Sequence, residues 1–164
     1  MATALVAPEG DILDRRNTAQ TYDEAVLYAM DLVEQHFHEE NPDQIDACMR
    51  LYATDAVWEA PARGVIYRGQ DDIRKNYLAV FEAAENIAFF GIERFGTPDR
   101  VVDDMWVTFR VRGPGFENCP YPVGTDVKMR LVHIFHIEDG LISKEIGYEC
   151  WTIDPRPGVS PLTY

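Results

Sequence analysis

The residues best suited to acid–base chemistry lie in one segment near the C-terminal end of the sequence. His133 stands among apolar residues, and Glu145 and Glu149 follow at even spacing. Residues two or four apart in a β-strand point to the same face, so the two glutamates should share a face. A titratable side chain on a buried face needs a partner or a function. Burial raises the pKa of a glutamate and a neighbouring histidine opposes this rise, so a His–Glu pair can transfer protons near neutral pH.

The turn between these two strands, at about residues 138–140, decides which side chains meet. If its glycine lies in a left-handed bulge, His133 lies opposite Glu145, with Cβ atoms roughly 5 Å apart. A tight two-residue turn would instead place Ile146 and Tyr148 beside His133, because a shift of one residue presents the other face of a strand. We expect the bulged register.

A second histidine is positioned by the first helix that the sequence predicts. Thr21 followed by Glu24 is a capping-box signal, and apolar residues at helical spacing follow it, so we expect a helix from about residue 21 to residue 38. His36 continues the apolar stripe and should face inward. His38 lies about 200° further around the helix, so the two histidines cannot chelate one metal ion from one face.

The remaining pattern predicts two more helices and then a run of strands. Asn41-Pro42 opens a short helix, and Gly69 precedes a third helix whose buried stripe includes Tyr77 and Phe81. The strands that follow form an antiparallel meander, so the fold class is α+β. The expected helices end at about residues 52 and 84, and the expected strands are 56–60, 64–68, 87–96, 100–112, 125–137 and 141–152.

The length of the chain indicates one domain with short flanking segments. A chain of 164 residues buries roughly two thirds of its unfolded surface, which is enough for one core that contains a pocket. We expect residues 1–19 to form a flexible N-terminal arm and residues 20–152 to form the single domain. Three prolines in residues 153–164 predict a C-terminal tail that cannot join the interior of a sheet.

The composition argues against several classes of partner. The net charge of -13, without a Lys/Arg cluster, argues against nucleic acids and anionic membranes. No apolar stretch approaches the roughly 18 residues that span a bilayer, so we expect a soluble protein. The three cysteines form no CxxC pair, which fits a reducing cytoplasm. The sequence has no glycine-rich dinucleotide loop and no trio of metal ligands at suitable spacing, so we expect neither a cofactor nor a metal.

The order of the elements and three motifs resemble a known family. The motifs are LYATDAVWEAP at residues 51–61, Gly64 and Gly69 before a helix, and HIFHIEDGLI at residues 133–142. Over about residues 20 to 152 the chain resembles the SnoaL-like and ketosteroid-isomerase-like branch of the nuclear-transport-factor-like superfamily. This resemblance implies a strongly curved antiparallel sheet that three helices in the N-terminal half close into a cone with a deep pocket, usually in a homodimer.

The resemblance also implies roles for individual positions. His36 falls where ketosteroid isomerases place an oxyanion-binding tyrosine. His133 falls where they place a second oxyanion donor, and where SnoaL-like cyclases place a catalytic Asp. The base of the isomerases falls on Ala60, so the chain lacks that carboxylate. An Asp of limonene-epoxide-hydrolase-like members falls on Gly147, so that catalytic set is missing too.

By the same resemblance, the last strand lines the cavity, and its glutamates replace the missing carboxylates. Gly147 between them leaves room for a ligand to approach the strand, and Trp58 beside the empty base position belongs to the wall. His136 has the opposite parity and lies on a surface suited to a dimer interface. The predicted catalytic residues are His133, Glu149, Glu145 and His36. The predicted substrate-binding residues are Trp58, Ala60, Leu131, Gly147, Trp151, Tyr77 and Phe81.

Three functions are consistent with this site. The first is a cofactor-independent acid–base enzyme, a cyclase, isomerase or dehydratase of the lyase or isomerase type, for a hydrophobic polyketide-like or terpenoid-like molecule. The second is a non-catalytic binding or dimeric accessory protein, since a fold alone does not give function. The third is an epoxide hydrolase-like enzyme in which Glu149 activates water. The first accounts best for titratable groups in an apolar pocket, with either Glu145 or Glu149 as the partner of His133.

Overall fold

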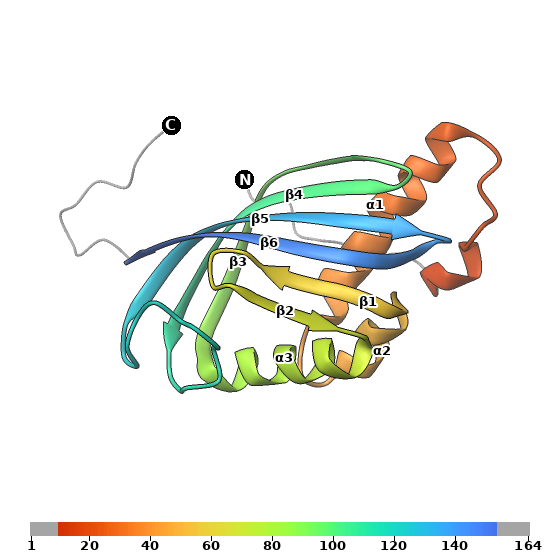
Figure 1. Cartoon of the computed structure of the whole chain (residues 1–164). Coiled ribbons are helices and arrows are strands. Elements are labelled where there is room, and N and C mark those ends of the chain that lie inside the picture. The colour runs from red at the N-terminus through yellow and green to blue at the C-terminus, as the bar shows by residue number, and fades with distance from the viewer. Residues whose placement is uncertain (1–9, 154–164) are drawn as a thin grey trace.

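The computed structural model describes residues 10–153, which form three α-helices and a curved six-stranded sheet (Figure 1). The α+β class predicted from the sequence is confirmed. None of the helices in residues 10–153 is long and apolar enough to cross a bilayer. The helices are η1 (Ile12–Arg15, a 3-10 helix), α1 (Tyr22–Glu39), α2 (Ile45–Arg50) and α3 (Gln70–Ala83). The strands are β1 (Tyr52–Ala60), β2 (Val65–Arg68), β3 (Ala84–Thr97), β4 (Arg100–Val111), β5 (Asp126–Glu138) and β6 (Leu141–Ile153).

Helix α1 begins at the predicted capping box and carries the predicted inward-facing histidine. The Thr21 hydroxyl accepts a hydrogen bond from the N–H of Glu24 at 3.2 Å, and the Glu24 carboxylate accepts one from the N–H of Thr21 at 3.0 Å. The buried stripe of the helix ends at His36, which is 0% exposed. Most of the predicted arm (residues 1–9) and of the predicted tail (154–164) lies outside the described residues, whereas Ile12 of η1 packs into the core.

The strand order in the sheet is β2-β1-β6-β5-β4-β3. Every neighbouring pair is antiparallel except β1 and β6, which are parallel. The sequence predicted antiparallel pairing throughout, but β1 and β6 are distant in the chain, so no hairpin fixes their relative direction. In β4 and β5 every second residue is buried, and these residues form the inner face of the sheet.

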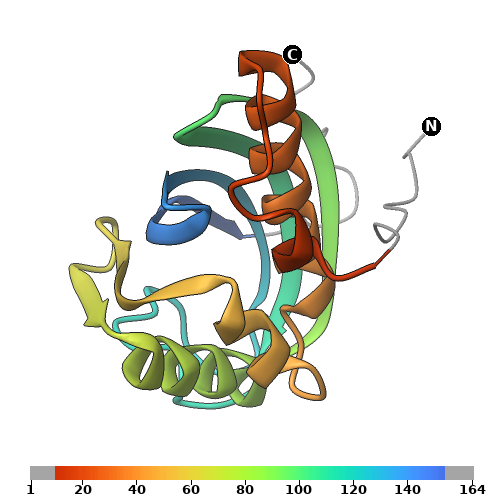
Figure 2. The ribbon, with the colours of Figure 1, turned by 90° about the vertical axis from the view of Figure 1, so that its right-hand side faces the viewer.

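Helix α3 spans the open side of the curved sheet. It packs against β1 and β2 at one edge and against β3 at the other, and α1 packs against β3 and β4. Figure 2 shows the resulting open arc of strands, with the helices on its inner side. One helix that contacts both edges of a bent sheet encloses a space between itself and the central strands. The side chains that face this space come from α3 and from every strand except β2.

The turn between β5 and β6 differs from the predicted one. Glu138 pairs with Leu141, so Asp139 and Gly140 form a tight two-residue turn, with φ values of 48° and 70°. Asp-Gly favours this turn because both central residues need positive φ and the twist of the turn matches that of the strands. The bulge lies further along β6, at Ser143, which has no partner in the pairing.

The predicted pairing of His133 with Glu145 is therefore wrong, although the predicted faces are right. His133 lies opposite Gly147, and Glu145 lies opposite Phe135. The tight turn alone would have sent the two glutamates to the outer face, and the extra residue of the bulge returns them to the inner one. His133, Glu145 and Glu149 all reach the enclosed space.

Candidate functional site

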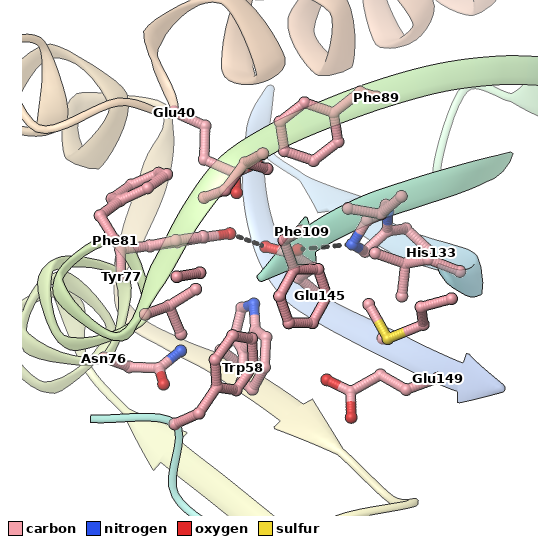
Figure 3. Close-up of a pocket in the computed structure, with 18 of the residues that line it drawn as sticks. Glu40, Trp58, Asn76, Tyr77, Phe81, Phe89, Phe109, His133, Glu145 and Glu149 are labelled. Atoms are coloured by element: carbon pink, nitrogen blue, oxygen red, sulfur yellow. Dashed lines mark hydrogen bonds and ion pairs between the residues drawn. The ribbon is translucent and has the colours of Figure 1, made fainter. Parts of the chain in front are cut away.

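A cavity lies between α3 and the inner face of the sheet (Figure 3). It contains about 620 Å³ of empty space, its open mouth included. Most of its wall is aromatic or aliphatic, as expected for a site that binds an apolar molecule. The apolar wall consists of Trp58, Tyr77, Val80, Phe81, Ala84, Ile87, Phe89, Val107, Phe109, Phe116, Met129 and Leu131, and the other lining residues are Glu40, Arg63, Asn76, His133, Glu145, Gly147 and Glu149.

Glu145 is the most deeply buried carboxylate of the cavity, with a side chain 1% exposed. Its Oε2 accepts hydrogen bonds from the hydroxyls of Tyr77 of α3, at 2.8 Å, and of Tyr52 of β1. Burial raises the pKa of Glu145 above its ordinary value. Burial and the neighbouring carboxylate also raise the pKa of both tyrosines, so they keep their protons and act as donors. A carboxylate held only by neutral donors can take up a proton readily.

His133 faces the second oxygen of the same carboxylate. Its Nε2 lies 3.6 Å from Oε1 of Glu145, and its Nδ1 is buried without a hydrogen-bond partner in the described part of the chain. Burial lowers the pKa of His133 to about 3, so the imidazole is neutral near pH 7. The expectation that this histidine holds Glu145 ionised is therefore wrong, because the cost of desolvating the imidazolium exceeds its attraction to the carboxylate.

His36 lies next to Glu145 but not in the cavity wall. Its Nδ1 is 3.3 Å from Sγ of Cys48, and its Nε2 is 3.4 Å from Oε2 of Glu40 and 3.9 Å from Oε2 of Glu145. Burial lowers the pKa of His36, so it is also neutral. His36 was predicted to lie in the pocket, but it lies behind Glu40 and Glu145, which line the cavity.

Glu149 has a different environment, because a cation is bound to it. Nε of Arg63 donates to both of its oxygens, at 3.1 and 2.9 Å, and the two side chains are only 2% and 5% exposed. The guanidinium carbon lies 5.6 Å from the ring centre of Trp58 and 5.2 Å from that of Phe116. Nε1 of Trp151 donates to Glu149 at 2.9 Å. Both oxygens of Glu149 are therefore occupied.

The structure places five of the seven predicted substrate-binding residues in the cavity wall. The exceptions are Ala60 and Trp151. Ala60 is fully buried in the core, and Trp151 packs edge-on against Phe109 and Phe116 of the wall. Within residues 10–153, no group of three or more His, Cys, Asp or Glu side chains is placed to hold a metal ion. The residues in the wall are Trp58, Leu131, Gly147, Tyr77 and Phe81.

Four polar residues of the site were not predicted from the sequence as site residues. Asn76 could have been found, since it lies three positions after the buried Ile73 on the same helical stripe. Tyr52, Arg63 and Glu40 carry no such signal, because contacts between distant parts of the chain bring them to the site. Asn76 and Trp58 each bury a side-chain N–H without an acceptor in the described chain, which leaves two donors at the cavity.

Comparisons with known proteins agree with this architecture. A comparison with curated protein sequences found no match. A candidate SnoaL-like polyketide cyclase from Jannaschia sp. CCS1 is similar in structure, with a TM-score of 0.68, 17% sequence identity, and coverage of 80% of this chain and 91% of that one. An NTF2-like protein from Burkholderia xenovorans LB400 has a TM-score of 0.64, 15% identity, and coverage of 80% and 93%.

A third structure was solved with a small molecule. It is a protein from Catenulispora acidiphila with a ketosteroid isomerase-like fold in complex with trimethylamine, and it has a TM-score of 0.57, 15% identity, and coverage of 71% of this chain and 83% of that one. At these identities the structures establish the fold alone. The sequence itself carries the assignment further, because residues 33–145 match the SnoaL-like domain. That match spans more than half of the chain, which therefore belongs to the SnoaL-like domain family.

Proposed function

We propose that this protein is a cofactor-independent acid–base enzyme, a cyclase, isomerase or dehydratase, for a hydrophobic polyketide-like or terpenoid-like small molecule. The observation that carries the proposal is the carboxyl of Glu145, which is buried in an apolar cavity among neutral hydrogen-bond donors. Its raised pKa brings it closer to the range in which a carboxylate serves as an effective general base.

The arrangement of donors around Glu145 favours proton abstraction next to a carbonyl group. When Glu145 takes a proton from carbon, negative charge develops on the carbonyl oxygen of the substrate. Trp58 and Asn76 offer N–H groups that no acceptor in residues 10–153 uses, so a substrate oxygen can bind there. Tyr77 and His133 also reach the cavity as neutral groups. The hydroxyl of Tyr77 therefore places no negative charge beside the enolate that develops.

Exchange of carbon-bound protons tests this chemistry before the natural substrate is known. A panel of apolar cyclic and open-chain ketones would be incubated with the protein in D₂O, and loss of the α-proton signals would be followed by NMR. We expect exchange above the buffer rate and a decrease of roughly 10²- to 10⁴-fold in Glu145→Gln, since a positioned base contributes about this much.

Glu138→Gln is the matched control, because it removes the same charge from an exposed position at the end of β5. It should exchange the ketones as the wild type does. Undiminished exchange in Glu145→Gln would refute the assignment of the base. Ketone binding without exchange by the wild type would favour the alternative function, a non-catalytic binding protein.

The epoxide hydrolase-like alternative has less support. It needs Glu149 to activate a water molecule, but both oxygens of Glu149 accept hydrogen bonds from Arg63, and one also accepts from Trp151. Incorporation of ¹⁸O from labelled water into an epoxide-derived diol would nevertheless revive it.

We further propose that the chain acts as a cytoplasmic homodimer. Phe90, Ile92 and Phe95 of β3 are 49%, 48% and 54% exposed, and a second copy could cover them. The thiols of Cys48, Cys119 and Cys150 are unpaired, which fits a reducing compartment. Light scattering would distinguish the 18.7 kDa chain from a particle of twice that mass.

A further inference from the structure

We propose that Glu40 is a second proton-transfer residue of the cavity and that the buried imidazole of His36 links it to Glu145. The proposal rests on the proposed function of Glu145 as a base and adds the acid that acts with it. No sequence motif points to Glu40, which is the residue that caps the C-terminal end of α1. Its importance follows from contacts among three segments of the chain.

Glu40 lines the same cavity as Glu145, but Glu40 lies at the end of helix α1 and Glu145 lies in the sheet. The side chain of Glu40 is 14% exposed, so a ligand can touch it. Figure 3 shows its carboxyl pointing from the end of α1 toward the groups of Tyr77 and Glu145. A molecule in the cavity would therefore have one carboxyl on its helical side and another on its sheet side.

The imidazole of His36 is placed between these two carboxyls. Its Nε2 lies 3.4 Å from Oε2 of Glu40 and 3.9 Å from Oε2 of Glu145, and the ring is 0% exposed. Sγ of Cys48 is near the other nitrogen, at 3.3 Å. Within residues 10–153, Nε2 forms no well-aligned hydrogen bond. A buried polar atom without a bond is costly, and each of the two carboxyls beside it can exchange a proton with it.

The charges around Glu40 favour its protonated form. Asp103 of β4 faces it with negative charge, while Cys48 of α2 and Tyr77 of α3 face it as neutral groups. Arg94 of β3, whose charge acts on the adjacent His36, is bound to Asp103 and Glu34. Burial, together with Asp103, raises the pKa of Glu40 to about 8. Glu40 thus keeps its proton at pH 7 and can serve as a general acid.

The two carboxyls and the imidazole can return to their starting protonation states after each proton abstraction. Glu145 takes a proton from the α-carbon of the substrate, the electron pair of the C–H bond moves to the carbonyl oxygen, and that oxygen takes the proton of Glu40. The products are a neutral enol, protonated Glu145 and ionised Glu40. Nε2 of His36 then accepts the proton from Glu145 and passes it to Glu40, so both groups return to their starting states.

The pH profile of ketone α-proton exchange in Glu40→Gln tests this role. We expect wild-type exchange to fall above about pH 8, as Glu40 loses its proton. Glu40→Gln should exchange roughly 10²-fold more slowly at pH 7 and lack this alkaline decrease, because the general acid is gone. A purely structural role would lower the rate at every pH and leave the decrease in place. Glu138→Gln replaces a glutamate at an exposed position outside the cavity wall and should keep the wild-type profile.

A titration that needs no substrate separates failure of this proposal from failure of the proposed function. In protein labelled with ¹³C at the glutamate carboxyls, one signal should titrate near pH 8 and be absent from Glu40→Gln. If the wild type exchanges no ketone, this titration alone decides. A Glu40 signal near pH 4.5, or an alkaline decrease that persists in Glu40→Gln, would overturn the proposal.

Discussion

Glu145 and Glu149 are the same residue type on the same face of one strand, yet their surroundings differ fundamentally. Both side chains are at most 5% exposed. Glu149 is bound to the guanidinium of Arg63, whereas Glu145 is surrounded by tyrosine hydroxyls and neutral imidazoles. The guanidinium of Arg63 compensates the negative charge of Glu149, whereas Glu145 can take up and release a proton. The partner that the fold supplies, and not the residue type, thus separates a structural carboxylate from a chemically active one.

The two carboxylates also differ in what they hold together. Arg63 connects Glu149 to the loop after β4, because its Nη1 donates to the carbonyl of Glu117 at 2.8 Å and its own carbonyl accepts from Asn118 at 2.9 Å. Glu145 instead joins β6 to side chains of β1 and α3. We therefore expect changes at the Arg63 end to affect mainly stability, and changes at the Glu145 end to affect mainly proton transfer.

The largest expected effect is the loss of stability in Arg63→Met. It leaves Glu149 buried without its cation, which typically costs about 3–5 kcal/mol of unfolding free energy. Arg110→Met is the control, since Arg110 pairs with Asp126 at a surface where the side chains are 42% and 62% exposed. That pair should contribute less than about 1 kcal/mol. Urea denaturation at pH 7 measures both, and equal losses would show that the pair at Glu149 is no more important than a surface pair.

A smaller effect is expected from Glu40→Gln on the pH dependence of stability. The pKa of Glu40 is about 8 in the folded protein and near 4.5 in the unfolded chain. Its contribution is therefore complete below about pH 4.5 and is lost as the pH rises toward 8. The variant has no such loss, so it should gain about 2–4 kcal/mol over the wild type between pH 5 and pH 8. Denaturation curves at both pH values measure the gain, and a constant difference would mean that Glu40 titrates normally.

The sequence was sufficient to predict local elements and faces but not the contacts that complete the site. The capping box of Thr21 and Glu24 and the even spacing of Glu145 and Glu149 are local signals, and both were interpreted correctly. The bulge at Ser143 left no such signal, because Ser143 does not have a positive φ and the bulge therefore needs no glycine that would mark it in the sequence. The pairing of His133 was missed for this reason. The two errors of turn and bulge compensated each other, which is why the inner face was still right.

The hydrogen bonds of Glu145 were out of reach for a different reason. Tyr52 approaches Glu145 only because β1 pairs in parallel with β6, which is distant in the chain. Parallel strands are not joined by a short turn, so no turn motif in the sequence predicts this pairing. The ion pair of Arg63 with Glu149 likewise depends on where a loop folds back over the sheet. Spacing within a segment predicted which groups face inward, whereas the partner that each group meets required the full topology.

The smallest expected effect would sharpen the contrast between the two carboxylates. Tyr77→Phe removes a hydrogen bond that stabilises ionised Glu145, so the pKa of Glu145 should rise further, by about one unit or about 1.4 kcal/mol. The acid side of the ketone exchange profile should move to higher pH by the same amount. Tyr67→Phe is the control, because the hydroxyl of Tyr67 donates to Glu117, outside the cavity wall, at 2.6 Å. If both variants keep the wild-type profile, the exchanging base is not the carboxyl that Tyr77 contacts, and the distinction drawn between Glu145 and Glu149 would lose its chemical meaning.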